Sequence, residues 1–229
     1  MKNHKKLIVF DWNGTLLSDT IPSWKASNIC LEFYGAPPIS LARFRETFNF
    51  PVLKFYEDNG VSAETVLERK DEGNQAFQSA YERLAAKART RKGAHDLLQN
   101  LNKQGHECMI LSNYITEKIE GHLQRLSMRG YFAHVNAHTC DGTTILQSTT
   151  KTLRLREYMR MEGASPEDTI IIGDSIEEPE IARALGITSI GITGGAISTA
   201  RLKAAAPDYI VSSLWEIKRL IKTLGAPIS

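Results

Sequence analysis

The chain has 229 residues, of which 42% are hydrophobic and 24% charged, and its formal net charge is +2. This composition is typical of a globular protein with a sizeable core. Because no basic block is longer than Lys5-Lys6 or Arg91-Lys92, we expect neither a nucleic acid nor a membrane surface as partner. Asp11 interrupts the apolar stretch that follows the basic N-terminus, and the other apolar runs are strand-sized, so we expect no signal peptide and no membrane span.

Short apolar, β-branched runs alternate with amphipathic stretches along most of the chain. The apolar runs are 7–10, 108–111, 169–172, 187–192 and 209–211. The amphipathic stretches are 95–103, 116–127, 150–162, 178–185 and 213–223. Continuous apolar runs indicate strands that are covered on both faces, as in a parallel sheet. The βαβα order predicts a Rossmann-like, doubly wound α/β fold.

Residues 20–90 break this pattern, because they contain few strand-like runs and a strong helical signal. Pro22 closely follows Asp19, which resembles the start of a helix. Apolar residues recur at helical spacing over 63–88, while 48–51 and 58–60 contain the Pro, Asn and Gly residues that separate helices. We therefore predict a core domain of residues 1–18 and 91–229, with an inserted all-α domain of residues 19–90.

The three cysteines, Cys30, Cys108 and Cys140, are far apart and form no Cys-x-x-Cys motif. Isolated cysteines in odd number indicate reduced thiols and predict a cytoplasmic location. The six histidines show no spacing typical of a metal site.

Polar residues follow the apolar runs where a ligand is expected. Asp11 follows the first run, Ser112 the second, and Gly173-Asp174 the third, while Lys151 opens the amphipathic stretch before the third. In a parallel sheet these residues converge at the carboxyl ends of the strands. Two carboxylates, a hydroxyl and a lysine at one edge suit Mg²⁺ and a phosphate group.

These motifs, taken in order, resemble those of the haloacid dehalogenase superfamily of phosphohydrolases, in its phosphoglycolate-phosphatase-like branch. The segment Asp11-Trp12-Asn13-Gly14-Thr15-Leu16 is similar to the first motif, and Leu111-Ser112-Asn113 to the second. Lys151 matches the third, and 172–178, which ends in Glu177-Glu178, matches the fourth. The inserted helical domain resembles the C1 cap of this superfamily, which is expected to close over the substrate.

The resemblance implies a role for each of these residues. Asp11 is the nucleophile that forms an aspartyl-phosphate. Mg²⁺ is held by Asp11, the backbone carbonyl of Asn13 and Asp174, with Glu178 either supporting the metal through water or orienting Lys151. Ser112, Lys151 and backbone N–H groups near Asn113 and Gly14 bind the phosphoryl oxygens.

Asn13 departs from the pattern, because phosphatases of this superfamily usually have an aspartate there as general acid and base. An amide cannot transfer protons at neutral pH, and loss of a general acid–base typically costs about 10²–10⁴ in rate. One hypothesis is a phosphatase whose proton comes from Asp19 or the cap, or whose leaving group needs little protonation. Another is a phosphate-binding protein that turns over poorly. Asn13-Gly14 is also a deamidation-prone pair, which would restore an acid.

A further alternative is a hydrolase resembling the phosphonoacetaldehyde hydrolases, whose first motif reads Asp-Trp-x-Gly-Thr and which use a cap lysine as a Schiff base. Lys54 lies at about the matching place, and Arg43 is a second candidate for contact with an anionic substrate. Our main prediction is a Mg²⁺-dependent phosphohydrolase that acts on a small phosphorylated molecule. The sequence does not predict the oligomeric state.

Overall fold

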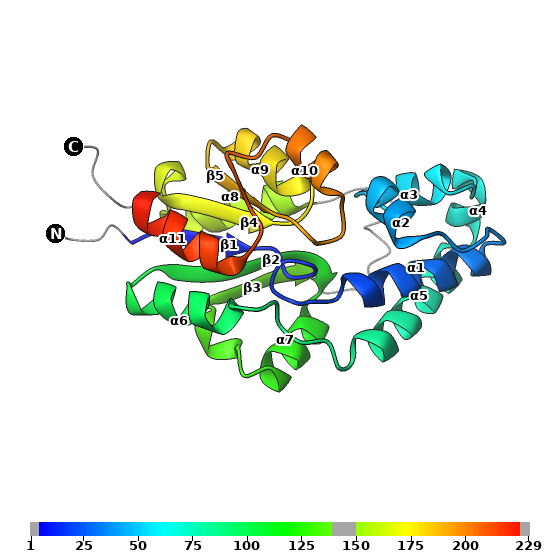
Figure 1. Cartoon of the computed structure of the whole chain (residues 1–229), viewed down its shortest axis with the longest axis horizontal. Coiled ribbons are helices and arrows are strands. Elements are labelled where there is room, and N and C mark those ends of the chain that lie inside the picture. The colour runs from blue at the N-terminus through cyan, green and yellow to red at the C-terminus, as the bar shows by residue number, and fades with distance from the viewer. Residues whose placement is uncertain (1–4, 139–149, 225–229) are drawn as a thin grey trace.

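The computed structural model describes residues 5–138 and 150–224. Cys30 and Cys108 are buried free thiols, whereas Cys140 lies outside the described residues. Within these residues, the strands form one sheet in which every neighbouring pair is parallel (Figure 1). Its members are β1 (Leu7–Phe10), β2 (Glu107–Ile115), β3 (His134–His138), β4 (Thr169–Gly173), β5 (Thr188–Ile192) and β6 (Tyr209–Val211).

The strand order is β3-β2-β1-β4-β5-β6, so the winding of the sheet reverses between β1 and β4. This is a doubly wound arrangement, and the predicted Rossmann-like α/β fold is confirmed. Phe10 is in register with Ile172 of β4 and with Ile110 of β2. Asp11 and Asp174 therefore follow adjacent strands at the same edge, in the crevice where such sheets bind ligands.

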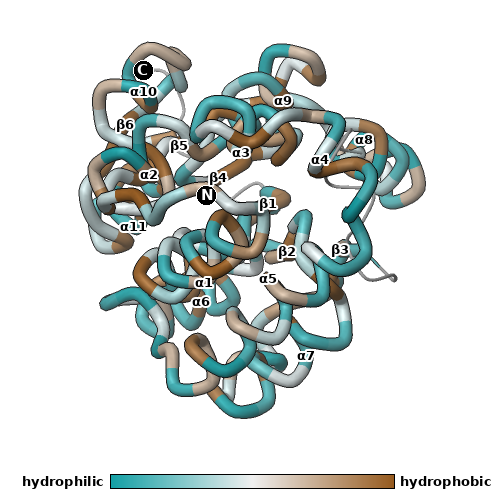
Figure 2. Tube along the Cα trace, turned by 90° about the vertical axis from the view of Figure 1, so that its right-hand side faces the viewer, coloured by the Kyte–Doolittle hydropathy of each residue, from teal (hydrophilic) through white to brown (hydrophobic). Residues whose placement is uncertain are grey.

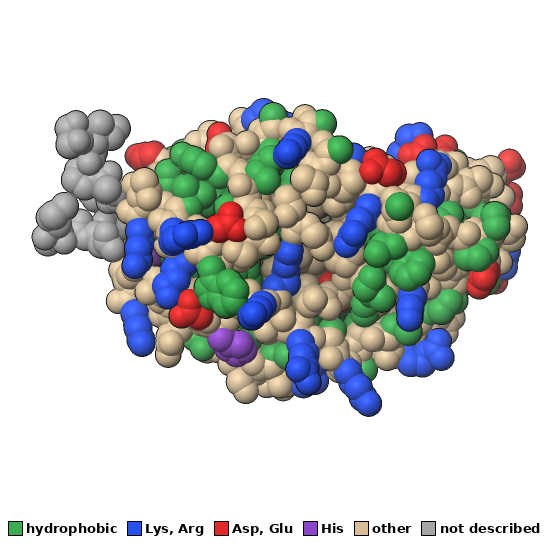
Figure 3. All heavy atoms as spheres, viewed as in Figure 1, with side chains coloured by type: hydrophobic (Ala, Val, Ile, Leu, Met, Phe, Trp, Pro, Cys, Tyr) green, Lys and Arg blue, Asp and Glu red, His purple; other side chains and the backbone are tan. Residues whose placement is uncertain are grey.

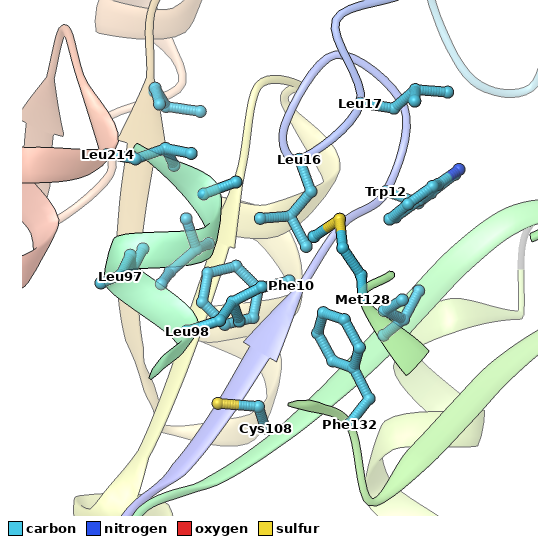
Figure 4. Close-up of a cluster of buried hydrophobic side chains, with 14 of the residues drawn as sticks. Phe10, Trp12, Leu16, Leu17, Leu97, Leu98, Cys108, Met128, Phe132 and Leu214 are labelled. Atoms are coloured by element: carbon cyan, nitrogen blue, oxygen red, sulfur yellow. The ribbon is translucent and has the colours of Figure 1, made fainter. Parts of the chain in front are cut away.

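Helices cover both faces of the sheet, and β1 contributes side chains to each face. Ile8 and Phe10 belong to one buried cluster, and Leu7 and Val9 to the other. Figure 4 shows the first cluster around Phe10. The helices of the core are α6 (Ala94–Lys103), α7 (Thr116–Arg125), α8 (Lys151–Glu162), α9 (Glu177–Leu185), α10 (Thr199–Ala204) and α11 (Leu214–Leu224). Several helices alternate hydrophilic and hydrophobic colours along the trace in Figure 2, as one-sided burial requires.

The segment between β1 and α6 is entirely helical and gathers at one end of the molecule (Figure 1). It consists of α1 (Thr20–Phe33), α2 (Leu41–Thr47), α3 (Leu53–Asp58), α4 (Ala63–Glu68) and α5 (Lys70–Ala85). These helices share a buried cluster that includes Leu31, Phe44 and Phe55. The chain leaves and re-enters the core side by side, since Ser18 N donates to Arg89 O at 2.8 Å and Arg91 N to Leu16 O at 2.8 Å.

Three elements differ from the sequence prediction. The stretch 63–88 forms two helices, because Arg69 is non-helical and its guanidinium lies over the Phe33 ring at 4.1 Å. β3 was not predicted because His134–His138 is a partly exposed edge strand without an apolar run. The six-residue helix α10 was also not predicted. Nowhere in residues 5–138 and 150–224 is a helix long and apolar enough to span a membrane.

The packing of α6 against the sheet yields a stability prediction. Leu98 is 0% exposed and Leu153 is 62% exposed. We expect Leu98→Ala to lower the free energy of unfolding by about 2–5 kcal/mol, because it leaves a cavity in the core. Leu153→Ala is the matched control and should change it by less than about 0.5 kcal/mol. Urea denaturation measures both, and similar effects of the two variants would contradict this description of the core.

Candidate active site

A cavity of about 140 Å³ lies between the carboxyl edge of the sheet and helices α1, α3 and α5. It brings together most of the residues that the sequence singled out, although they are far apart along the chain. These lining residues are Asp11, Asn13, Gly14, Ser112, Asn113, Lys151 and Asp174.

Asp11 and Lys151 form a buried ion pair at the floor of this cavity. Asp11 directly follows β1, and its backbone N–H donates to Ile172 O of β4 at 2.8 Å. Lys151 is the first residue of α8, and its Nζ donates to Asp11 Oδ1 at 2.9 Å. Burial raises the pKa of Asp11 well above its usual range, against the opposing effect of Lys151. The carboxylate is thus poorly solvated and held by one strong donor.

Lys151 also contacts the two glutamates at the start of α9. Its Nζ lies 2.9 Å from Glu178 Oε1 and 3.4 Å from Glu177 Oε2. Burial alone would lower the pKa of Lys151, but Asp11, Glu178 and Glu177 together raise it well above the usual value. Ser175 Oγ donates to Glu178 Oε2 at 2.7 Å. Glu178 is therefore fully engaged in holding Lys151 and the loop after β4.

Asp174 is the second acid of the site and directly follows β4. Thr15 Oγ1 lies 3.0 Å from Asp174 Oδ1 and 3.3 Å from Asp11 Oδ2, so one hydroxyl reaches both carboxylates. Ala196 N donates to Asp174 Oδ2 at 2.6 Å. A Cβ on Gly14 or Gly195 would overlap the Asp174 carboxylate, and Gly14 also has a φ of +70°. Glycine at both positions lets the backbone approach this acid closely.

The donor set fits Mg²⁺. Asp11 and Asp174 are buried and share Thr15 as a neighbour, and the Lys151 ammonium pairs with Asp11 and the adjacent glutamates. In the described part of the chain, no cluster of three or more His, Cys, Asp or Glu side chains could hold a metal by itself. Mg²⁺ does not require such a cluster, because it keeps several waters and takes one or two carboxylates plus substrate oxygens.

Ser112 and Asn113 follow the apolar residues 108–111 of β2 and line the cavity as predicted. Both already form hydrogen bonds within the protein. Ser112 is 1% exposed, and its Oγ accepts from Tyr114 N at 3.1 Å. Asn113 Nδ2 donates to Glu177 Oε2 at 2.8 Å, so this amide nitrogen is already bonded. Arg154 supports the loop by donating to Ser112 O at 2.8 Å. The Ser112 hydroxyl retains a proton that it can donate to a ligand oxygen.

Asn13 lies in a network that links the loop after β1 to the inserted helices. Its Nδ2 donates to Asp19 Oδ2 at 2.7 Å and to Tyr81 OH at 2.8 Å, and the Tyr81 hydroxyl donates to Asp19. Both amide protons of Asn13 are therefore used, which leaves Oδ1 as an acceptor for water. Burial raises the pKa of Asp19.

Gly14 does not fit its predicted role as a phosphate donor. Its N–H donates to Asp19 Oδ1 at 2.7 Å and is engaged within the protein. Its carbonyl accepts from Arg91 Nη1 at 2.7 Å. Gly14 instead shapes the turn that carries Asn13 past Asp174.

Three predicted site residues do not line the cavity: Lys54 and Arg43 on the inserted helices, and Glu178, which contacts Lys151 but is not part of the lining. Lys54 Nζ pairs with Asp58 Oδ1 at 2.7 Å, and its side chain is 58% exposed. The hydrogen bond to Asp58 raises the pKa of Lys54, which is opposite to what a Schiff-base lysine needs. Arg43 Nε donates to Asn59 Oδ1 at 3.1 Å within the inserted helices.

Some residues that support the site were not identified from the sequence. Tyr81, Arg91 and Arg154 each contact a motif residue through a side chain that comes from elsewhere in the chain. Tyr81 falls in the stretch of helical spacing over 63–88, and nothing in that spacing indicates a hydroxyl at Asp19. Arg91 belongs to a short basic pair, and neither Arg91 nor Arg154 lies in a pattern that indicates a ligand site.

Comparisons with known proteins identify the family of the chain. A family model described as haloacid dehalogenase-like hydrolase matches residues 8–192. The chain belongs to this family. It is therefore a hydrolase by family, and the resemblance inferred from the four motifs is confirmed.

Among curated relatives, the chain is similar to phosphoglycolate phosphatases. It is 27% identical over 229 residues to that of Synechococcus elongatus, covering 95% of this chain and 97% of the relative. It is 24% identical over 217 residues to phosphoglycolate phosphatase 1 of Pseudomonas aeruginosa, covering 93% and 78%.

Solved structures show the same fold. A predicted phosphatase from Clostridium acetobutylicum has a TM-score of 0.79 at 24% identity, covering 96% of this chain and 99% of that one. A hydrolase from Pseudomonas syringae has a TM-score of 0.77 at 18% identity, covering 97% and 100%. At these identities the likeness concerns the fold alone.

The burial of Asp174 yields a pH prediction. Burial raises its pKa to about 6 in the folded protein, whereas an unfolded aspartate titrates near 3.9. Between these values the folded state retains a proton that the unfolded state has lost, so stability falls as the pH rises. An asparagine at this position cannot titrate, so the Asp174→Asn variant should not lose this stability. In EDTA, we expect its unfolding free energy relative to that of the unmodified chain to rise by roughly 1–3 kcal/mol from about pH 4 to pH 7. Urea titrations at several pH values measure this difference, and parallel profiles would contradict it.

Proposed function

We propose that this hydrolase is a Mg²⁺-dependent phosphohydrolase that cleaves a small organic phosphate monoester through an aspartyl-phosphate on Asp11. One observation carries the proposal: Lys151 Nζ lies 2.9 Å from Asp11 Oδ1 in a cavity that also contains Asp174 and Ser112. The printed names of the curated relatives, which are phosphoglycolate phosphatases, support the same reaction type.

In the first step, an oxygen of the Asp11 carboxylate attacks phosphorus. The bond from phosphorus to the ester oxygen breaks, and its electron pair leaves with that oxygen, which takes up a proton as the alcohol departs. Lys151 and the Ser112 hydroxyl donate hydrogen bonds to the phosphoryl oxygens and stabilise the charge of the transfer. Asp11, Asp174 and the backbone carbonyl of Asn13 would hold Mg²⁺, which would supply further neutralisation of those oxygens.

In the second step, water attacks phosphorus and the bond to Asp11 breaks, which releases phosphate and restores the carboxylate. Asn13 Oδ1 can accept a hydrogen bond from this water, but it cannot take its proton. Asp19 and Tyr81 contact Asn13 and line the cavity. We propose that these two groups exchange the protons of both steps. One proton goes to the leaving ester oxygen in the first step, and one comes from the attacking water in the second.

Glu178 is better suited to orienting Lys151 than to binding the metal. Its Oε1 accepts from Lys151, and its Oε2 accepts from Ser175 N at 3.2 Å and Ser175 Oγ at 2.7 Å. The attraction of Lys151 overcomes burial and lowers the pKa of Glu178. An ionised Glu178 therefore keeps Lys151 charged and aimed at Asp11.

Two rival functions remain distinct from this proposal. A phosphonoacetaldehyde hydrolase-like reaction requires a lysine at the substrate, and Lys54 is bonded to Asp58 away from the cavity. A phosphate-binding protein with poor turnover would share the site and differ only in rate. Tight binding of phosphate esters without hydrolysis of any of them would favour this second rival.

The nucleophile is tested by Asp11→Asn. We expect this variant to lose turnover of p-nitrophenyl phosphate in the presence of Mg²⁺, because an amide cannot form the aspartyl-phosphate. The expected loss is at least about 10⁴-fold in kcat, comparable to removal of other nucleophiles. Asp71→Asn, at an exposed position on α5, is the matched control. Retained activity of Asp11→Asn would exclude Asp11 as nucleophile.

The role of Asn13 is tested by Asn13→Asp. Asn13 Nδ2 is 2.7 Å from Asp19 Oδ2, so a carboxyl at position 13 would share a proton with Asp19 and serve as a general acid. We expect the rate on alkyl phosphates to rise by roughly 10–10²-fold more than that on aryl phosphates, whose leaving groups need little protonation. Steady-state kinetics on both ester types measure the difference, with Asn102→Asp on α6 as control. An equal change for both ester types would argue against this account.

A further inference from the structure

We propose that the cavity under the inserted helices selects phosphate monoesters whose alcohol is uncharged and largely apolar, and that it discriminates against carboxylate-bearing esters such as phosphoglycolate. This proposal rests on the proposed phosphohydrolase function, since it concerns the leaving-group side of the same cavity. It separates this chain from the activity that its curated relatives are named for.

The side of the cavity that the inserted domain forms is lined by aromatic rings. Phe48 and Phe50 pack edge to face at 5.3 Å, Tyr34 and Tyr56 at 5.2 Å, and Phe77 stacks on Tyr81 at 5.8 Å. These side chains come from separate parts of the inserted domain and converge on one space. All six rings line the cavity: Tyr34, Phe48, Phe50, Tyr56, Phe77 and Tyr81. Such a surface gains free energy by covering apolar atoms and loses it by desolvating a charge.

The cavity offers no free cation to a carboxylate. Among the described residues that line it, Lys151 is the only Lys or Arg. Its Nζ already contacts Asp11, Glu177 and Glu178, and in catalysis it serves the phosphoryl group. The other charged lining residues are Asp11, Asp19 and Asp174, which repel a second anion.

The cations of the nearest inserted helices are directed elsewhere. Arg43 and Lys54 bond to residues 58 and 59, as described above. Arg45 Nε donates to Gly195 O at 3.2 Å, which ties α2 to the loop after β5. Many Lys and Arg side chains are spread over the outer surface, where Figure 3 shows them among Asp and Glu. Positive charge is therefore abundant on the protein but does not enter the leaving-group side.

Gln78 provides one polar contact in this apolar lining. It lies on α5 one turn before Tyr81, and its Oε1 is buried without a hydrogen-bond partner. A buried acceptor of this kind is satisfied by a hydroxyl or amine of the ligand. The leaving group can therefore carry one hydrogen-bond donor at this point of an otherwise apolar lining.

Binding tests the proposal without requiring turnover. Butylphosphonate and 3-phosphonopropionate are non-hydrolysable ligands of similar size, which share two methylenes next to phosphorus and then end in an ethyl group or a carboxylate. With the full chain in MgCl₂, calorimetry should give a Kd for butylphosphonate at least about tenfold lower than for 3-phosphonopropionate. Equal or reversed affinities would overturn the proposal.

Hydrolysis provides the second comparison. Propyl phosphate and phosphoglycolate are both esters of primary alcohols, so the demand for a proton on the leaving oxygen is similar. We expect kcat/KM for propyl phosphate to exceed that for phosphoglycolate by at least about tenfold. If neither ester is hydrolysed while butylphosphonate still binds more tightly, the phosphohydrolase function fails and the selectivity of the cavity stands. A preference for phosphoglycolate would overturn the proposal and leave the phosphohydrolase function intact.

A matched pair of variants on α5 tests whether the lack of a cation on the leaving-group side determines the selectivity. Gln78→Arg places a guanidinium on the leaving-group side, whereas Gln75→Arg adds the same charge at an exposed position one turn earlier. We expect Gln78→Arg to shift the affinity ratio of the two phosphonates by at least about tenfold toward 3-phosphonopropionate, and Gln75→Arg to leave it unchanged. The same shift in both variants would indicate a long-range charge effect and would contradict the proposed selection inside the cavity.

Discussion

The buried ammonium of Lys151 is the group on which the rest of the site depends. It contacts three carboxylates, that of Asp11 at the end of β1 and those of Glu177 and Glu178 at the start of α9, the helix after the adjacent strand β4. Without it, these acids would be buried together and unpaired, which is strongly destabilising. The strand order of the sheet places them at one edge, and α8 supplies the lysine that makes their proximity tolerable. The fold can therefore bring these acids together only because Lys151 balances their charge.

A second network connects this charged centre to the inserted helices. Asn13 follows β1, Asp19 precedes α1 and Tyr81 belongs to α5, yet their side chains are mutually hydrogen-bonded. In this arrangement the amide at position 13 donates to Asp19, whereas a carboxylate there would have to share a proton with it. Asn13, the residue that departs from the family pattern, is thus matched to the neighbouring Asp19. The proposed proton exchange and the attachment of the inserted helices share these groups.

The sequence predicted the core of the fold because its strands are continuous apolar runs that end in polar residues. It failed for β3, where an edge position permits His134 and His138 in place of apolar residues. Asp11, Ser112, Lys151 and Asp174 were found because each follows an apolar run or begins an amphipathic stretch in the sequence. Lys54 was proposed by analogy along the chain, and only the structure gives the direction of its side chain.

The character of the cavity could not be read from the sequence at all. Its aromatic rings come from four separate segments of the inserted domain, and in each segment the same residues are also plausible core. Tyr56 and Phe77, for example, pack in the buried cluster of the inserted helices and also line the cavity. Only the packing of these helices determines which rings face the substrate and which cations face solvent.

The central claim is that Asp11 accepts the phosphoryl group, and chemical trapping tests it most directly. Enzyme quenched in acid during steady-state turnover and then reduced with borohydride should contain homoserine at position 11, because borohydride reduces an acyl phosphate and leaves a free carboxylate unchanged. Peptide mass spectrometry across residues 7–19 locates the product. We expect homoserine at Asp11 only when substrate and Mg²⁺ are both present. Efficient turnover with unmodified Asp11, or homoserine at Asp19 instead, would contradict the account.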